Sequence, residues 1–316
     1  CYGLGGKMAT ISDANMVLGR LPPEQLLGGN LKLDIEAAQK SISEVGSQLG
    51  LDIISTAEQA LEVAHFKMAQ AIRELTVERG LDPREFSICA FGGAGPLHAA
   101  FIAEELEIKK IVIPSSAGAF SAWGMLQSDL RHDMTITYFR KFNEAQTDLS
   151  DTMSLLKKRV LKRVLDDKAD LRSIRYESSA EMRYTGQEYS LLVPLDKNAA
   201  DGELLESFHE AYFLRYGHSQ PDAPVEFVSL RMAGIVDFEK TKSTLSTIIS
   251  GETNPVGERM VFFNGKSVNV PIYSRENIEK PVEGYAIVLE KSTTIIVPRE
   301  WSVLPTKGDH LIMERN

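Results

Sequence analysis

Residues Ser87–Leu106 read SICAFGGAGPLHAAFIAEEL, and this stretch decides the fold. The pattern predicts a short apolar strand over 88–91 and an alanine-rich helix that begins at Pro96, where the missing N–H of proline costs nothing. Glycines let a backbone approach a ligand closely, and the first turn of a helix presents unpaired N–H groups. The segment between strand and helix, Gly92-Gly93-Ala94-Gly95, is therefore predicted to be a nucleotide cradle.

A Rossmann dinucleotide site is the first alternative for this turn. His98 stands where the third glycine of that fingerprint belongs, and the next predicted strand, 110–113, is followed by Pro114 and Ser115 where an acidic residue would hold a ribose. Both departures argue against a Rossmann site. The second alternative is a tight strand-to-helix turn that binds no ligand.

Composition excludes several classes of protein. The 316 residues suffice for two or three domains, and 43% hydrophobic and 25% charged residues are ordinary for a globular protein. A net charge of −9 argues against a nucleic-acid partner, and no apolar run reaches the roughly 20 residues of a membrane span. Cys1 and Cys89 form no CxxC pair, which argues against a disulfide framework or a cysteine zinc site. We expect a cytoplasmic protein without nucleic-acid or membrane partners.

The first 33 residues are predicted to be irregular structure around polar side chains. The chain begins with Cys1 and a glycine-rich turn, without the pattern of a signal peptide, so we expect a fragment of a larger protein. Asp13 has two interpretations. It either caps a short helix over 14–18, or its carboxylate lies beside a ligand or a Mg²⁺ ion.

Two amphipathic helices are predicted to follow. The first begins at Asp34 and ends at Gly50. The second has a capping-box pattern at Thr56 and Gln59, runs to about residue 79 and stops at Gly80. His65 lies in the second helix and is interpreted as structural.

Alternating strands and helices up to residue 130 predict an α/β domain with a mainly parallel sheet. In such a sheet, ligands lie off the carboxyl ends of the strands. Residues 91–98 and 114–124 are both small-residue loops at such ends, so we expect them on one rim of the sheet.

The rest of the chain is predicted to form two further domains. Residues 131–240 carry helical and alternating patterns, including a hairpin over 174–193, and read as an α+β domain. Residues 241–258 are rich in Ser, Thr, Gly and Pro and suit a linker. Residues 259–316 show only short strands, with an Asn264-Gly265 hairpin turn, and suggest a small β-barrel or sandwich.

Motifs along almost the whole chain resemble the hydantoinase A and 5-oxoprolinase family, an ATP-dependent group that also contains ATP-binding subunits of acetone and acetophenone carboxylases. The motifs are, in chain order, Cys1-Tyr2-Gly3, Gly5-Gly6, Ser12-Asp13-Ala14-Asn15, Leu18-Gly19-Arg20-Leu21, Leu27-Gly28-Gly29, Leu33-Asp34, Phe91 to Ala99, Ser121-Ala122-Trp123-Gly124, Asp129, Arg183-Tyr184-Thr185-Gly186-Gln187-Glu188-Tyr189, Arg215-Tyr216-Gly217-His218, Thr293-Thr294, Val297-Pro298 and Trp301.

The resemblance implies a fold and a nucleotide site. It implies that residues 1–130 are part of the second lobe of an ATPase fold like that of actin, Hsp70 and sugar kinases, and that the amino-terminal lobe is missing. It also implies that the glycine turn approaches the adenosine of ATP. The implied nucleotide-binding residues are Gly92, Gly93, Ala94, Gly95 and His98, although local packing is the alternative for His98.

The resemblance also implies a reaction. Phosphoryl transfer to a carbonyl oxygen creates a leaving group, so the whole protein would open a cyclic amide such as a hydantoin or 5-oxoproline with ATP and Mg²⁺. The implied roles are Asp13 for orienting water or the metal, Asn15 for binding phosphate or substrate, and Arg20 for neutralising charge. Capping and salt bridges are the alternatives for these three side chains.

The implied partners are a small-molecule substrate and a subunit of the hydantoinase B type, and we expect an oligomer. Two alternative functions stay open. The whole protein could activate a ketone for carboxylation, as the acetone and acetophenone enzymes do, or this segment could be an assembly domain without catalytic function.

Overall fold

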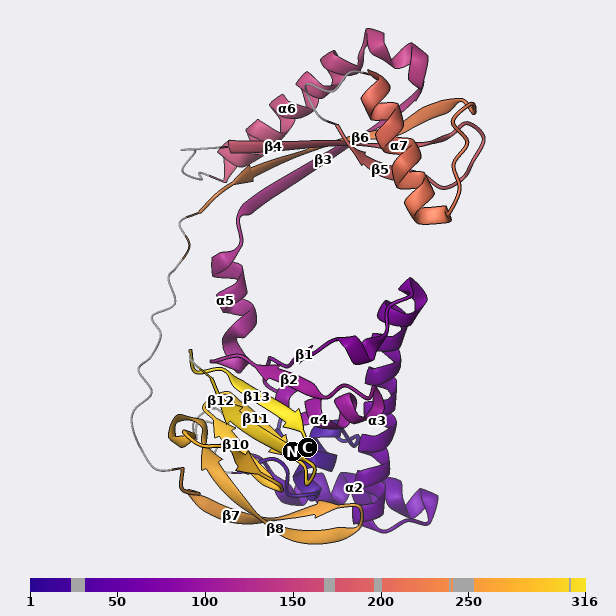
Figure 1. The fold of residues 1–316 in the computed structure, drawn as a ribbon. Coiled ribbons are helices and arrows are strands. Elements are labelled where there is room, and N and C mark those ends of the chain that lie inside the picture. The colour runs from indigo at the N-terminus through magenta and orange to yellow at the C-terminus, as the bar shows by residue number, and fades with distance from the viewer. Residues whose placement is uncertain (24–31, 168–173, 196–200, 239, 241–252, 307) are drawn as a thin grey trace. The chain divides into compact units, whose positions relative to one another are not determined.

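The computed structural model describes residues 1–23, 32–167, 174–195, 201–238, 240, 253–306 and 308–316. They form two compact units (Figure 1). Unit 1 contains Cys1–Met125 and Lys242–Asn316, and unit 2 contains Leu126–Thr241. In the part of the chain that is described, no helix is long and apolar enough to cross a membrane.

Three helices open unit 1, namely α1 (Ile11–Val17), α2 (Ile35–Leu49) and α3 (Ile53–Thr76). Asp34 caps α2 by accepting a hydrogen bond from the backbone N–H of Ala37, and Gly50 ends it in the left-handed conformation, so the predicted bounds are confirmed. The predicted capping box of α3 is wrong. Asp52 caps this helix, and the Thr56 hydroxyl donates to the Asp52 carbonyl at 2.7 Å.

The five-stranded sheet of unit 1 combines the middle of the chain with its end. Its strands are, in sheet order, β1 (Ile88–Cys89), β2 (Lys110–Ile113), β13 (Leu311–Arg315), β12 (Trp301–Pro305) and β9 (Val282–Glu283). Only β1 and β2 pair in parallel here. The expected mainly parallel sheet is therefore corrected to a mixed sheet, because short connections at the end of the chain favour antiparallel pairing.

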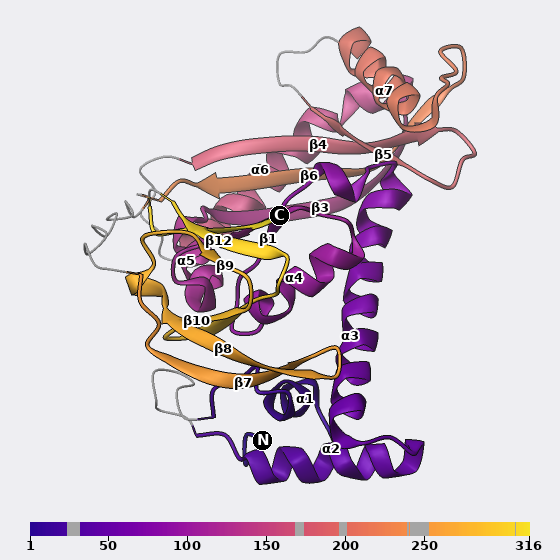
Figure 2. The ribbon, with the colours of Figure 1, turned by 60° about the horizontal axis from the view of Figure 1, so that its bottom comes forward.

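A second sheet of unit 1 is built from later strands alone. Its order is β11 (Thr293–Val297), β10 (Ala286–Glu290), β8 (Lys266–Ser274) and β7 (Gly257–Phe263). Asn264 and Gly265 join β7 to β8 with φ values of 51° and 72°, which confirms the predicted hairpin turn. Figure 2 shows α1 between β7 and α2, and the Phe262 N–H donates to the Leu18 carbonyl at 3.0 Å.

The end of the chain belongs to the same compact unit as its beginning, which differs from the separate β-rich domain predicted for 259–316. Strand β13 pairs with β2 from Leu311 opposite Ile113 to Glu314 opposite Lys110. Trp301 is fully buried, and its indole N–H donates to the Glu104 carboxylate at 2.8 Å. A short β-rich segment of this size buries little apolar surface alone, so it completes the core of unit 1 instead.

Unit 2 is an antiparallel sheet packed with two helices (Figure 1). Helix α6 packs on β3 and β6, and α7 packs on β5. The predicted hairpin is confirmed by the pairing of β4 with β5, from Ser179 opposite Pro194 to Met182 opposite Leu191. The elements are β3 (Leu130–Lys141), α6 (Leu149–Asp166), β4 (Ile174–Tyr184), β5 (Leu191–Pro194), α7 (Asp201–Tyr216) and β6 (Val225–Val236).

The predicted linker, 241–258, lies mostly outside the described residues, as do Leu27, Gly28 and Gly29 of the family motifs. Within the predicted linker, residues 257 and 258 already belong to β7.

We predict that Gly19→Ala lowers the free energy of unfolding by about 2–4 kcal/mol. Gly19 has a φ of +74°, and an added Cβ would collide with the backbone carbonyl of Met260. Gly50→Ala is the matched control, because Gly50 has a φ of +71° with open space around it, and we expect a loss of only about 1 kcal/mol there. Urea unfolding of both variants measures the difference, and equal losses would contradict the contact with β7.

Candidate functional site

The glycine turn between β1 and α4 (Gly95–Glu105) is held in place by backbone hydrogen bonds. The Ala90 N–H donates to the Val112 carbonyl at 2.8 Å, which extends the pairing of β1 with β2. Gly92 has a φ of +83°, where a side chain would be strained, and its N–H donates to the Ala117 carbonyl at 2.8 Å. The loops after β1 and β2 therefore lie side by side, as predicted.

A third loop, the turn between β10 and β11, contacts the loops that follow β1 and β2. The Thr293 hydroxyl donates to the Gly93 carbonyl at 2.9 Å. A Cβ at Gly118 would collide with the Ser292 side chain, so Gly118 is needed for close packing of this turn. Thr293 belongs to a family motif, but no local pattern predicted its contact with the glycine turn, because the two segments lie 200 residues apart.

The surface of the turn is open to solvent. Gly93, Ala94 and Gly95 are exposed, and no atom lies within 4 Å of a Cβ built on Gly92. No side chain caps α4. Pro96 has no N–H and the Leu97 N–H donates to the Ala94 carbonyl at 3.1 Å, so an anion would meet mainly the exposed backbone of Gly93, Ala94 and Gly95. The Phe91 ring is 44% exposed beside the turn and lies 5.4 Å from the Phe120 ring, which offers an apolar surface for a flat base.

Asp13 is the third helical residue of α1 and part of a capping box. Its Oδ2 accepts hydrogen bonds from the backbone N–H and the hydroxyl of Thr10, at 2.8 and 2.7 Å, and its Oδ1 lies 2.6 Å from the backbone nitrogen of Cys1. Burial raises the pKa of Asp13, but these hydrogen bonds from Cys1 and Thr10 bring the pKa below its usual value. The geometry supports the capping alternative for this carboxylate.

The residues present do not fit a Mg²⁺ site around Asp13. Both of its oxygens are engaged and the side chain is buried. Among the described residues, no group of three or more His, Cys, Asp or Glu side chains could hold a metal ion. Mg²⁺ prefers an octahedron of oxygen ligands, which one buried and engaged carboxylate does not supply.

Asn15 is buried inside α1 with 1% exposure. Its amide nitrogen donates to the Ile11 carbonyl at 2.9 Å, and its Oδ1 has no hydrogen-bond partner among the described residues. Its predicted role toward phosphate or substrate stays a prediction.

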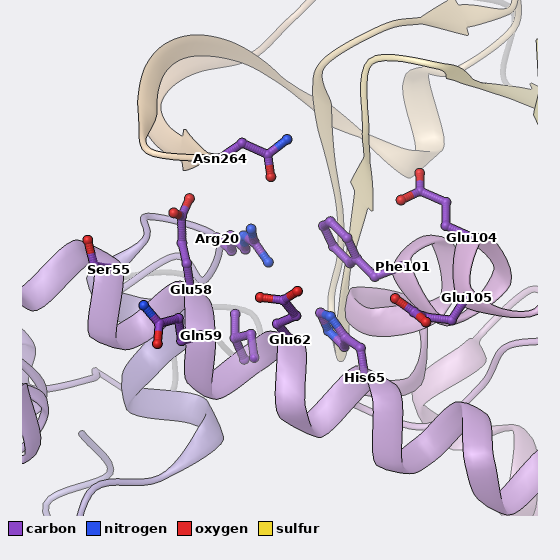
Figure 3. Close-up of a pocket in the computed structure, with 11 residues that line it drawn as sticks. Arg20, Ser55, Glu58, Gln59, Glu62, His65, Phe101, Glu104, Glu105 and Asn264 are labelled. Atoms are coloured by element: carbon purple, nitrogen blue, oxygen red, sulfur yellow. The ribbon is translucent and has the colours of Figure 1, made fainter. Parts of the chain in front are cut away.

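Arg20 lies at the bottom of a pocket of about 420 Å³ (Figure 3). The side chain is 5% exposed, and its guanidinium lies over the rings of Phe101 and Phe263, at 4.6 and 5.3 Å from the ring centres. Among the described residues its Nη2 donates to the Phe262 carbonyl at 3.4 Å, and its Nε has no partner there. Burial lowers the pKa of Arg20 to about 10, although nearby Glu58 raises it.

Glutamates of α3 and α4 line the same pocket. Glu58 and Glu62 stand four residues apart on α3, and Glu104 and Glu105 end α4 (Figure 3). Sequence reasoning missed these four residues. The spacing on one face of a predicted helix was a usable signal, but Arg20 comes from another segment, so the sequence did not reveal the pocket.

His65 and His98 form a buried pair beside this pocket. The Nε2 of His65 lies 2.9 Å from the Nδ1 of His98, and the His65 ring stacks on Phe101 with centres 4.8 Å apart. Burial is the main cause that lowers the pKa of His65 to about 3 and that of His98 to about 4, and the positive charge of Arg20 adds to both shifts. The burial and contacts of His65 support its structural interpretation, although its ring also lines the pocket, and the geometry of His98 supports its packing alternative.

The predicted site residues therefore fall into three groups. Gly92, Gly93, Ala94 and Gly95 form one turn, in which Gly92 is half-buried and the other three residues are exposed. Arg20 and His98 share the buried neighbourhood of Phe101, whereas Asp13 and Asn15 bond within and next to α1.

Comparison with known proteins identifies the family. The model of the family "Hydantoinase/oxoprolinase" matches residues 1–134, and that of the "Hydantoinase/oxoprolinase C-terminal domain" matches residues 139–310. The chain belongs to the hydantoinase/oxoprolinase family. The resemblance of the sequence motifs is thereby confirmed.

Several relatives share this region. The alpha subunit of caprolactamase from Pseudomonas jessenii is 32% identical over 96% of this chain, and the 5-oxoprolinase PfmaA from Pestalotiopsis fici is 29% identical over all of it. The structure of the ATP-dependent caprolactamase matches with a TM-score of 0.75 and 29% identity. A nucleotide-free acetone carboxylase structure matches with a TM-score of 0.78 at 24% identity, which shows a shared fold.

The chain spans less than half the length of these relatives, namely 46% of the caprolactamase subunit, 26% of the 5-oxoprolinase and 48% of either matched structure.

We predict that Asp13→Ala lowers the free energy of unfolding by about 2 kcal/mol because the capping box is lost. Turnover per folded molecule of the full-length protein should change little. Asp34→Ala is the matched control, since Asp34 caps α2 through one backbone hydrogen bond. Thermal melts and initial rates measure both effects, and a turnover loss of about a hundredfold in folded Asp13→Ala would support a catalytic carboxylate instead.

We predict that the His65–His98 pair makes unfolding easier in acid. Both pKa values lie below 6.5, the usual value for histidine, so the unfolded chain binds more protons than the folded chain below that pH. The contribution of the pair to the free energy of unfolding is therefore fully present above pH 6.5. It falls toward pH 4, by up to about 1.4 kcal/mol per pH unit for each histidine. Denaturant titrations should show a shallower slope for His65→Gln than for the wild type, and an unchanged slope would contradict the buried neutral pair.

Proposed function

We propose that this chain supplies part of the nucleotide site of an ATP-dependent enzyme that opens cyclic amides. The observation that carries the proposal is the exposed glycine turn at the carboxyl ends of β1 and β2, where three loops converge. Support comes from the relatives. The names caprolactamase and 5-oxoprolinase each refer to a cyclic amide, and the matched caprolactamase structure is that of an ATP-dependent enzyme.

We further propose that unit 1 belongs to the second lobe of an ATPase like actin, Hsp70 and sugar kinases. The support is local. A strand, a glycine turn and a helix stand where a nucleotide would contact backbone N–H groups, and Gly92 needs its positive φ to make that turn. The other lobe and a hydantoinase B-type subunit would complete the site in the whole protein, which we expect to be oligomeric.

The chain's own residues would act mainly by positioning. Amides are poor electrophiles, and bound ATP would supply a phosphoryl group to the amide oxygen, which would make the carbonyl carbon open to attack by water so that the C–N bond can break and the amine can leave. The turn would hold the nucleotide through backbone groups, which need no reorganisation during the reaction. Arg20 supplies a buried positive charge that could neutralise an anion. The capping box of Asp13 would fix α1, the helix that precedes Arg20 in the chain. Mg²⁺ usually binds through one or two carboxylates together with substrate phosphates and waters, and Asp13, whose two oxygens are engaged, would not be one of these carboxylates.

We predict that Gly93→Val weakens ATP binding of the full-length protein at least tenfold. A Cβ at Gly93 meets only the Ser292 carbonyl, at 3.6 Å, so the variant should fold, but its methyl groups would occupy the space that the nucleotide needs. Gly202→Val is the control, because Gly202 also has open space and lies in unit 2. Calorimetric titration with ATP checks this, and unchanged affinity in a folded Gly93→Val protein would contradict the cradle.

The reaction itself can be tested by the ATPase activity of the full-length protein with its partner subunit. We expect stimulation by a cyclic amide such as a hydantoin, 5-oxoproline or caprolactam without bicarbonate. Stimulation only by a ketone, with bicarbonate incorporated into the product, would assign the protein to the carboxylases. Failure of the full-length protein to bind ATP, alone or with its partner subunit, together with capture of that subunit, would favour an assembly domain.

A further inference from the structure

The pocket beside Arg20 is lined by charges of both signs, one arginine and four glutamates, and its lining does not include the glycine turn. Its volume of about 420 Å³ suits a molecule the size of an amino acid. The lining comes from the Leu18–Leu21 region, α3, α4 and the β7–β8 turn, so the pocket is built from segments far apart in the sequence (Figure 3).

Arg20 gives the pocket a buried cation without a counterion in contact. Its guanidinium offers five N–H donors in one plane, and the described residues engage them only through the 3.4 Å contact with the Phe262 carbonyl. No carboxylate of the described chain lies within salt-bridge distance of it. A buried charge without a partner is costly, and a planar carboxylate is the group that pairs best with a guanidinium.

Glutamates give the rim the opposite charge. Glu58 is engaged with the Gly265 N–H at 2.9 Å, and Glu104 accepts a hydrogen bond from Trp301. Glu62 and Glu105 also line the pocket and are exposed, and their carboxylates have no hydrogen-bond or ion-pair partner in the described part of the structure. These two side chains can therefore receive an ammonium group.

The charge pattern selects between ligand classes. A dicarboxylate or a phosphate would be repelled by the four glutamates, and a simple cation would be repelled by Arg20. We propose that this pocket binds a free amino acid, with its carboxylate on Arg20 and its ammonium group on Glu62 and Glu105. Phe101 beneath the guanidinium lines the pocket and would contact the aliphatic part of the ligand.

An amino acid carries the same two charged groups as the product of cyclic-amide opening, and this connection rests on the proposed function. Hydrolysis of a cyclic amide adds water across the C–N bond, so the carbonyl carbon becomes a carboxylate and the nitrogen leaves as an amine that takes up a proton. The product carries both charges on one chain, and the pocket presents the complementary pair.

The test is calorimetric titration of the full-length protein with straight-chain ω-amino acids of three to six carbons. We expect at least one to bind at least tenfold more tightly than hexanoate and hexylamine, which carry one charge each. Glu62→Gln should weaken that binding about tenfold, and Arg20→Lys should weaken it as well because the planar pair is lost. Glu74→Gln is the control, since Glu74 is exposed on the same helix but does not line the pocket.

Each outcome is decisive. Binding by none of the amino acids, or equal binding by hexanoate or hexylamine, would overturn the proposal, and so would binding that Glu62→Gln leaves unchanged. Glu62 is exposed, so this variant keeps the test valid if Arg20→Lys does not fold. ATP titration of the same samples separates the two claims. Failure to bind ATP refutes the proposed function, whereas failure to bind amino acids with ATP binding intact refutes only this pocket.

Discussion

The pairing of β2 with β13 is the constraint on which unit 1 depends. It joins Ile113 to Leu311 across almost two hundred residues and brings the last strands into the sheet that carries the glycine turn. The same arrangement buries Trp301 against α4 and sets the β10–β11 turn beside Gly93 and Gly118. Without this pairing, β1 and β2 would be a two-stranded sheet, which is marginal in stability. The geometry of the turn thus depends on segments from the middle and the end of the chain.

The two sites of unit 1 differ in how they are built. At the glycine turn, backbone groups and glycine conformations set the shape, and side chains contribute little beyond Thr293. In the pocket beside Arg20, side chains of opposite charge determine the electrostatics, and the buried guanidinium packs against two aromatic rings. Helix α4 contributes to both, since its first residues belong to the turn and its last residues line the pocket. A displacement of α4 would therefore alter the geometry of both sites.

Local signals in the sequence predicted what local physics controls. Asp34, Gly50 and the Asn264-Gly265 turn act through hydrogen bonds and conformations within a few residues, and all three predictions are confirmed. The capping-box pattern at Thr56 and Gln59 predicts a helix start there, but the helix begins earlier, with Asp52 as its cap. The separate carboxy-terminal domain could not be excluded from the sequence, because pairing over two hundred residues leaves no local pattern. The pocket was missed for the same reason, although Arg20 itself was found through a family motif.

Contact between the nucleotide and the glycine turn can be tested by photo-crosslinking of the full-length protein with an azido-ATP, followed by mass spectrometry of the labelled peptides. We predict labels within residues 91–98 and 114–124 of this chain, and loss of those labels when unmodified ATP competes. Labels that ATP displaces but that lie only outside these two loops would contradict this contact.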